Sequence, residues 1–175
     1  MADCTLCALV EKKDGVVFET DALVILLAPQ PAIPGHLLVV PKKHVPIMEQ
    51  VPSETLSALW TAASKATLGL FHAFQAGGTN VLVRNGPAAG QAFGHFSLEV
   101  LPRSAGDGLP LQWQPRQLGE EEMSTIELRV KEEAAKMSEG AAEPAEEAAF
   151  AEEKAKEKEI KKGEDYLIRQ LQRLP

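Results

Sequence analysis

The stretch Asn85–Arg103, NGPAAGQAFGHFSLEVLPR, joins a glycine-bounded turn to a strand-like segment. From residue 93 onward its polar and apolar side chains alternate with a period of two, which is typical of a strand with one buried face. Same-side neighbours on a strand stand about 6.6 Å apart, so His95, Ser97 and Glu99 would form one polar row. This row indicates either a site that handles protons or metal ions, or an ordinary half-exposed strand face.

The composition limits the classes of partner. The chain has 175 residues, 45% of them hydrophobic, a formal net charge of -7 and a sequence pI near 5.2. This length fits one ordinary domain plus an appendage. The acidic balance argues against nucleic acid and anionic membranes as main partners, because both reward clustered basic charge. No signal peptide and no run of about 20 apolar residues is present, so we expect a soluble cytoplasmic protein.

Hydrophobic periodicity and turn signals predict an α+β domain. We expect a short helical turn within residues 1–12 and a helix from a Ser53 cap to about Phe74, followed by a second main helix from Glu120. About five mostly antiparallel strands are expected at residues 16–18, 22–27, 36–40, 80–84 and 93–101.

The C-terminal part differs in composition from the rest. We expect the domain to span residues 1–137 and residues 138–175 to form a charged helical extension, because Ala, Glu and Lys dominate much of that segment. The stripe formed by Tyr166, Leu167, Leu171 and Leu174 should dock on an apolar surface.

The Asn85–Arg103 stretch resembles the signature of the histidine triad (HIT) family, in which an asparagine, a glycine turn and G-Q precede a His-x-His-x-His triplet. The upstream segment Gly35–His44, GHLLVVPKKH, extends the resemblance. The triplet is degenerate here and reads His95-x-Ser97-x-Glu99. The resemblance implies a HIT-like fold with a mostly antiparallel sheet and two main helices, usually as a homodimer joined along a helix and a sheet edge.

Cys4 and Cys7 form a C-x-x-C pair, which in a reducing compartment is more often metal-binding or redox-active than part of a disulfide framework. A structural zinc ion needs two further nitrogen or sulfur ligands. Spacing alone leaves an incidental reduced cysteine pair as an alternative. A zinc-bearing branch of the HIT family uses a C-x-x-C, the histidine after P-K and the first triplet histidine, so the resemblance implies a zinc site of Cys4, Cys7, His44 and His95.

In the HIT family, the asparagine before the glycine turn and the G-Q after it line a phosphate site. The resemblance therefore implies ligand-binding roles for Asn85, Gly90 and Gln91, and a nucleotide or phosphorylated metabolite as ligand. Two matching places are altered. The family's acidic ribose-binding residue falls at Ala28 and its phosphate-contacting serine at Ala92, so we expect weaker binding or another pose.

HIT enzymes act at the α-phosphate of nucleotides through a covalent intermediate on the middle triplet histidine, which is Ser97 here. A serine hydroxyl is a weak nucleophile unless a base activates it, and Glu99 or His36 could be that base. His36 matches a family histidine near the site, with a structural histidine as the alternative. We interpret the chain as a zinc-containing nucleotide-binding protein that has lost covalent nucleotidyl transfer.

Two other functions stay open. The chain could be an enzyme, a nucleoside phosphate or phosphoramidate hydrolase or a nucleotidyl transferase, with non-standard catalytic chemistry at Ser97, Glu99 and His36. It could also be a protein–protein interaction module that uses the C-terminal arm.

Overall fold

The computed structural model describes residues 4–138. The chain divides into two compact units, Met1–Trp113 and Gln114–Pro175, each described here by itself. The expected helical extension falls, apart from its first residue, outside the described residues, and so does its apolar stripe. The expected domain boundary at residue 137 stays a prediction.

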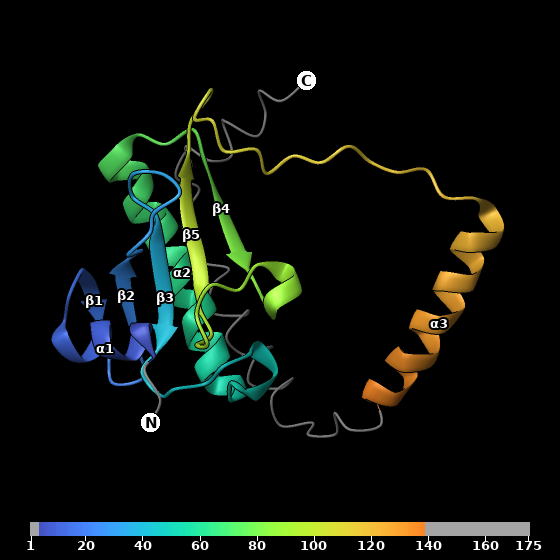
Figure 1. Cartoon of the computed structure of the whole chain (residues 1–175), viewed down its shortest axis with the longest axis horizontal. Coiled ribbons are helices and arrows are strands. Elements are labelled where there is room, and N and C mark those ends of the chain that lie inside the picture. Colours follow the sequence, from blue (N-terminus) through green and yellow to red (C-terminus); the bar gives the residue numbers. More distant parts are fainter. Residues whose placement is uncertain (1–3, 139–175) are drawn as a thin grey trace, which may run out of the picture. The chain divides into compact units, whose positions relative to one another are not determined.

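A five-stranded sheet forms the centre of the first unit (Figure 1). Its order is β1-β2-β3-β5-β4, and all neighbouring strands are antiparallel. This arrangement confirms the predicted α+β class and the five-stranded antiparallel sheet. The strands are β1 (Val16–Glu19), β2 (Leu23–Leu27), β3 (Leu37–Pro41), β4 (Gly78–Val83) and β5 (Leu98–Arg103).

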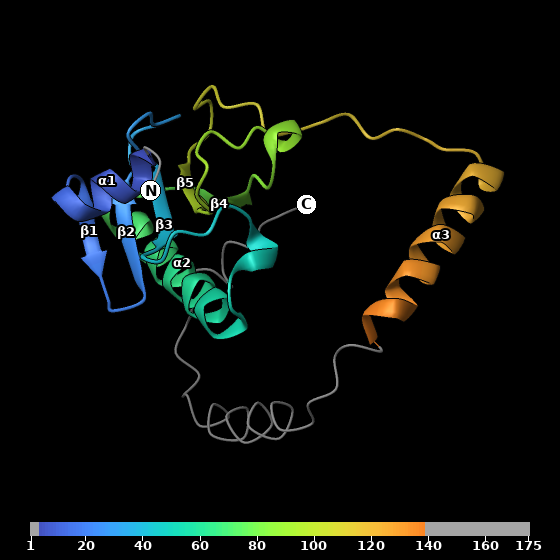
Figure 2. The same ribbon diagram turned by 60° about the horizontal axis from the view of Figure 1, so that its bottom comes forward.

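Different helices cover the two faces of the sheet (Figure 1, Figure 2). The long helix α2 (Ser53–Phe74) packs on one face, and the short helix α1 (Thr5–Lys12) packs on the other. Side chains alternate between the two faces along each strand. Within β2, for example, Ile25 belongs to the core under α2, whereas Val24 belongs to the core under α1.

The expected Ser53 cap is wrong. The residue before the first turn of α2 is Pro52, in an extended conformation, and no side chain caps this end. Ser53 lies inside the helix, where the N–H of Leu56 donates to the Pro52 carbonyl at 2.9 Å. This is the ordinary first bond of the helix, which the carbonyl of any residue at that position accepts, so no side chain takes the place of the expected cap.

The expected strand at residues 93–101 begins too early. The observed strand β5 starts at Leu98, and the preceding segment is irregular. The reason lies in the backbone hydrogen bonds, because the N–H of Phe96 donates to the Val45 carbonyl in the loop after β3, at 2.7 Å. The alternation of burial continues across this boundary, with Phe96, Leu98 and Val100 all in the core under α2.

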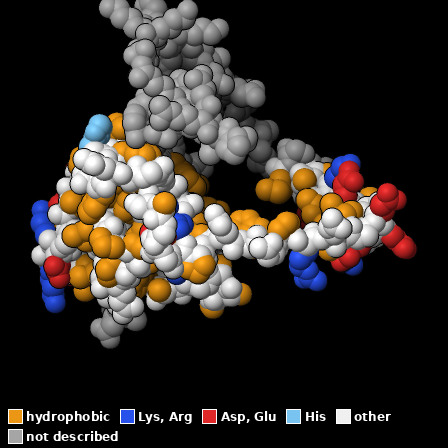
Figure 3. Space-filling view, turned by 90° about the horizontal axis from the view of Figure 1, so that it is seen from above, with side chains coloured by type: hydrophobic (Ala, Val, Ile, Leu, Met, Phe, Trp, Pro, Cys, Tyr) orange, Lys and Arg blue, Asp and Glu red, His pale blue; other side chains and the backbone are white. Residues whose placement is uncertain are grey.

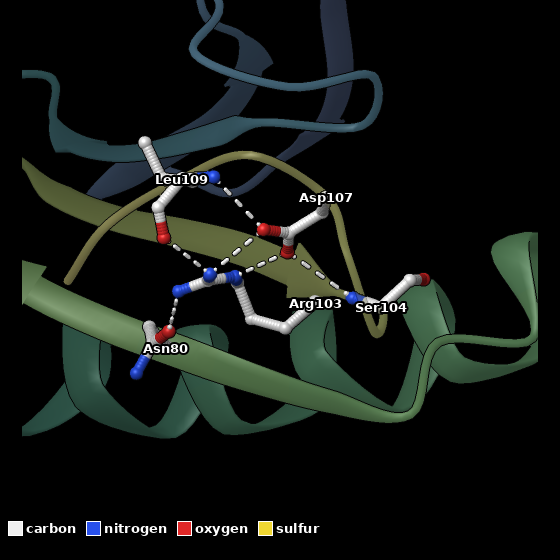
Figure 4. A network of polar contacts seen from close by, with 5 residues as sticks. All are labelled: Asn80, Arg103, Ser104, Asp107 and Leu109. Atoms are coloured by element: carbon white, nitrogen blue, oxygen red, sulfur yellow. Dashed lines mark hydrogen bonds and ion pairs between the residues drawn. The ribbon is translucent and has the colours of Figure 1, made fainter. Parts of the chain in front are cut away.

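A polar network fixes the segment after β5 (Figure 4). The Arg103 guanidinium donates to Asp107 Oδ2 at 2.6 Å and to Asp107 Oδ1 at 2.9 Å. It also donates to Asn80 Oδ1 on β4 at 2.7 Å and to the Leu109 carbonyl at 2.6 Å. Hydrogen bonds from Arg103 hold the pKa of Asp107 well below its usual range. The network therefore ties the chain beyond β5 back to β4.

In the second unit, helix α3 (Glu120–Ser138) confirms the second main helix expected from Glu120. Its side chains from 120 to 137 are exposed, and charged and hydrophobic groups share its surface (Figure 3). Within residues 4–138, none of the helices has the length and apolar character that a membrane crossing requires.

Gly35 occupies a position where we expect alanine to be costly. Its φ of +83° lies in the left-handed region, and an added Cβ would stand 2.8 Å from Phe74 Cε2. Gly35→Ala should lower the free energy of unfolding by about 1–2 kcal/mol, because a side chain is strained in this conformation. Urea denaturation measures the change.

The matched control for this prediction is Gly69→Ala, inside α2. No atom lies within 4 Å of a Cβ added there, so alanine should raise the free energy of unfolding by up to about 1 kcal/mol. A Gly35→Ala protein as stable as the wild type would contradict the expected strain.

Candidate metal centre and polar cluster

Cys4, Cys7, His44 and His95 meet in space although they come from separate segments. Their ligand atoms all lie within 4.8 Å of one another. Cys4 immediately precedes α1 and Cys7 lies one turn into it, so both thiols can face the same side of the helix. His44 follows β3 and His95 precedes β5. These four residues, which we call the metal quartet, could hold a metal ion.

The distances within the metal quartet suit a tetrahedral ion. Cys7 Sγ lies 3.4 Å from His44 Nδ1 and 3.4 Å from His95 Nδ1, and Cys4 Sγ lies 3.5 Å from His95 Nδ1. Tetrahedral zinc with bonds of about 2.3 Å to sulfur and about 2.1 Å to nitrogen separates such atoms by roughly 3.6 Å. The four side chains therefore fit zinc with little movement.

The orientation of His95 is set by the Pro41 carbonyl. His95 Nε2 lies 3.0 Å from that oxygen, so this nitrogen carries the hydrogen and donates. Nδ1 then keeps its lone pair, and it faces both thiols. Metal-binding histidines commonly have such a partner on the other ring nitrogen. The His95 ring is buried and stands nearly perpendicular to the His44 ring, at 81°.

The electrostatics of the quartet favour a bound cation. Burial lowers the pKa of His95 and so keeps its imidazole neutral. Burial, together with the neighbouring Cys4 thiol, raises the pKa of Cys7 to about 11. A thiolate is therefore unfavourable there unless a positive charge balances it. A metal ion supplies that charge and displaces the thiol proton.

A second group of polar side chains, the polar cluster, consists of His36, Arg84 and Glu99. Glu99 lies in β5, opposite Leu38 of β3 and Leu82 of β4. His36 precedes β3 and Arg84 follows β4, each two residues from a partner of Glu99. Because side chains two residues apart share a face, all three meet. His36 Nε2 lies 3.4 Å and Arg84 Nη2 3.2 Å from Glu99 Oε2.

The polar cluster contains buried atoms that lack good hydrogen bonds. The N–H of Ala32 donates to His36 Nδ1 at 3.2 Å, so the ring hydrogen sits on Nε2 and points toward Glu99. Neither His36 Nε2 nor Glu99 Oε2 has a hydrogen-bond partner within residues 4–138. The two residues are only 5% and 8% exposed. Glu99 Oε2 is nevertheless paired with the Arg84 guanidinium, which offsets part of the cost of burying the carboxylate.

The candidate catalytic residues are only partly brought together. His36 and Glu99 are in contact, as described above. Ser97 is half-buried and lies just before β5, and among the described contacts its hydroxyl has no hydrogen bond to either residue. Ala28, at the place of the family's ribose-binding residue, is buried beside His36, because its N–H donates to the His36 carbonyl at 2.9 Å.

The candidate ligand-binding residues form a braced turn. Asn85 accepts from the Met48 N–H at 3.0 Å and donates to Glu49 Oε1 at 2.7 Å. Gln91 Oε1 accepts from the Gly86 N–H at 2.7 Å, and Gln91 Nε2 donates to the Pro46 carbonyl at 2.7 Å. Both amide side chains thus hold the turn in place.

Glycines allow the backbone of this turn to close on itself. Gly86 and Gly90 have φ values of +91° and +78°, which other residues rarely adopt. The N–H groups of Ala89 and Gln91 donate to the Gly86 carbonyl, and the N–H of Gly90 donates to the Pro87 carbonyl. Ala92 follows the turn and is exposed. These backbone donors are therefore already used within the turn.

Sequence reasoning missed three contributors to these sites. The Pro41 carbonyl orients a metal-quartet histidine, Glu49 pairs with Asn85, and Arg84 pairs with Glu99. Arg84 could be found only with the register of the sheet in hand. Once Glu99 is placed opposite Leu82, the residue two places after Leu82 falls on the Glu99 face.

The five-stranded antiparallel sheet, with a Cys₂His₂ quartet beside a degenerate triplet, defines the class of protein. A family model described as the HIT domain matches residues 10–106 of the 175, which is more than half of the chain. The chain therefore belongs to the HIT family, and its predicted membership is confirmed.

Two relatives are named for nucleotide chemistry. The adenylylsulfatase HINT3 of Arabidopsis thaliana is 29% identical over 61% of this chain and 55% of its own length. The chain thus spans about half of that protein. A bis(5'-adenosyl)-triphosphatase of Dictyostelium discoideum is 27% identical over 67% of this chain and 85% of its own length.

Solved structures share the fold. A HIT family protein from Bacillus anthracis superposes with a TM-score of 0.67 and 26% identity, over 75% of this chain and 97% of that one. A zinc-bound histidine triad family protein from Mycobacterium smegmatis superposes with a TM-score of 0.58 and 28% identity, over 65% and 84% of the two chains.

Proposed function

We propose that this chain binds a nucleotide or phosphorylated metabolite, forms no covalent intermediate with it, and is stabilised by zinc. The observation that carries the proposal is the degenerate triplet: Ser97 stands where the family has its nucleophilic histidine. Glu99 stands where the family has the last histidine and is fixed between His36 and Arg84. A carboxylate there repels phosphate oxygens, whereas stabilising their developing charge requires donors or cations.

The relatives support the ligand class. The names of two relatives, an adenylylsulfatase and a bis(5'-adenosyl)-triphosphatase, refer to adenosine compounds. The turn that holds Asn85, Gly90 and Gln91 resembles the family's phosphate site, and this resemblance supports a ligand that carries a phosphate. Support for zinc comes from the donor set of two thiols and two imidazoles, which suits zinc, and from the zinc-bound mycobacterial neighbour.

We also propose that the protein is a cytoplasmic homodimer. Strand β4 is an edge strand whose side chains are only half-buried, so its free edge is available to a second copy. Helix α2 exposes Trp60, Leu68 and Phe74, which supports a contact along the helix. Cys4 and Cys7 must stay reduced to serve as metal ligands, which favours a reducing compartment.

A second candidate function is catalysis with non-standard groups. The observation that favours it is the contact between two buried polar groups, His36 Nε2 and Glu99 Oε2, at 3.4 Å. Glu99 could accept a proton from Ser97 or from water if either hydroxyl moved into contact with it, and the His36 Nε2–H could orient the carboxylate. An interaction role for the C-terminal arm rests on residues outside the described part of the chain.

Calorimetric titration with AMP and adenosine, together with chromatographic assays of diadenosine triphosphate and adenosine phosphosulfate, tests the two candidates. We expect the protein to bind AMP. We also expect the wild type to turn over diadenosine triphosphate and adenosine phosphosulfate no faster than Ser97→Ala does. A protein that binds none of these four compounds would refute the proposal. Turnover that Ser97→Ala and His36→Asn both abolish would establish the catalytic alternative.

A further inference from the structure

Arg84 lies between the polar cluster and the glycine turn. Its Nη2 is 3.2 Å from Glu99 Oε2. At the other side, a Cβ added to Gly90 would stand 3.8 Å from Arg84 Cδ, so the arginine stem runs along the turn. The Arg84 side chain is 39% exposed, compared with 11% for Glu99. Arg84 therefore reaches from a buried carboxylate to the accessible surface of the turn.

Most backbone donors of the glycine turn are already used. The N–H groups of Ala89, Gly90 and Gln91 donate to carbonyls within the turn, and that of Gly86 donates to the Gln91 side chain. The Asn85 amide is bound to Glu49. An anion at this turn would find most N–H groups already hydrogen-bonded and would be repelled by the nearby carboxylates. A cation is needed to offset this repulsion.

Arg84 can supply that cation. A guanidinium has five N–H donors in a rigid fork that suits phosphate oxygens. The contact with Glu99 engages Nη2, and within residues 4–138 the other nitrogens of the fork remain available to a ligand. Glu99 lies near the start of β5, paired with β3 on one side and β4 on the other, so it gives the flexible arginine one fixed position.

We propose that Arg84 binds the phosphate of the ligand, that Glu99 is its positioning residue, and that the site selects a nucleoside monophosphate over a triphosphate. The inference rests on the proposed function and names its ligand class. Arg84 offers one guanidinium fork, which one phosphate group can fill. Further phosphates would add negative charge beside the carboxylates of Glu99 and Glu49, whose repulsion opposes binding.

The test is calorimetric titration of AMP, ATP and adenosine into the zinc-loaded full chain. Arg84→Gln should weaken AMP binding roughly tenfold or more, because it removes charged hydrogen bonds, and should leave adenosine binding unchanged. Arg84→Lys keeps the charge without the fork and should give an intermediate loss. Glu99→Gln should reduce the preference for AMP over ATP. The matched control, Arg129→Gln on α3, changes the same charge elsewhere.

Two outcomes of these titrations overturn the inference: equal AMP affinity in the wild type and Arg84→Gln, or an equal loss of adenosine binding. Zinc content and Tm of each variant identify general unfolding. Should Arg84→Gln fail to fold, the wild type is titrated with inorganic phosphate instead. A shift of the NMR signal of the Arg84 Nε–H is then the test of phosphate binding.

This NMR measurement also separates the inference from the proposed function. A shift at Arg84 with phosphate, in a protein that binds no nucleotide, would refute the proposed function and support the phosphate-binding role. No shift at Arg84 would refute the inference, whatever nucleotides bind.

Discussion

Cys7→Ser is expected to abolish stoichiometric zinc binding and to lower the Tm by roughly 10 °C or more. The wild type should carry one zinc per chain, because Cys4, Cys7, His44 and His95 bring their ligand atoms within 4.8 Å. Metal binding to such sites is coupled to folding and contributes several kcal/mol at the least. The quartet joins α1 to the segments that flank β3 and β5, so its loss releases contacts between distant parts of the chain.

Elemental analysis and a thermal melt measure both effects. Thr5→Ala is the matched control, because Thr5 lies on the same helix and is exposed, and it should change neither zinc content nor Tm appreciably. A wild-type protein that contains no zinc when purified without chelator would contradict the metal site. A Cys7→Ser protein that keeps its zinc would do so too.

Ser97→His is expected to leave nucleotidyl transfer at background, roughly 10⁶-fold or more below an efficient enzyme, since enzymes commonly supply 8 kcal/mol or more. The new imidazole would have Glu99 beside it, and the Glu99 carboxylate is already fixed by His36 and Arg84. Alanines at positions 28 and 92 would still lack the hydrogen-bonding groups that the family places there. One added nucleophile cannot replace that missing orientation and charge stabilisation.

The activity of Ser97→His is measured as turnover of diadenosine triphosphate, with Ser97→Ala as the control. The two variants should be indistinguishable. Fast turnover by Ser97→His would mean that the rest of the site is intact and that the serine alone silences it.

The fold was predictable because its burial pattern follows the period of each element. The alternation through Phe96, Leu98 and Val100 identified the core face correctly. The pattern could not reveal where the strand begins, because burial does not specify hydrogen-bond partners. The N–H of Phe96 donates to Val45 rather than to a strand, and only the folded backbone makes that choice visible.

The metal quartet was predictable from the family resemblance but not from spacing. The gaps between Cys7, His44 and His95 match no compact zinc motif. The residues meet because β3 and β5 are neighbours in the sheet and α1 packs over one face. Topology, rather than local sequence, brings these ligands together.

The polar cluster was predictable only in part. His36 and Glu99 were candidates, and the structure places them in contact. Arg84 was treated as the end of a strand, because its role depends on the β4–β5 register that brings it to Glu99. The braces made by Asn85 and Gln91 depend likewise on loops far away in the sequence.

Native mass spectrometry tests the central claim most directly, with the protein mixed with AMP as ligand and, separately, with diadenosine triphosphate as adenylyl donor, because the experiment reports the metal, the ligand and any covalent adduct. With AMP we predict the mass of a homodimer that carries one zinc ion and one nucleotide per chain, and this nucleotide should be lost completely on denaturation. An adenylyl group that stays attached to the denatured chain would contradict the loss of covalent transfer. A spectrum without zinc, or without any bound nucleotide, would contradict the account equally.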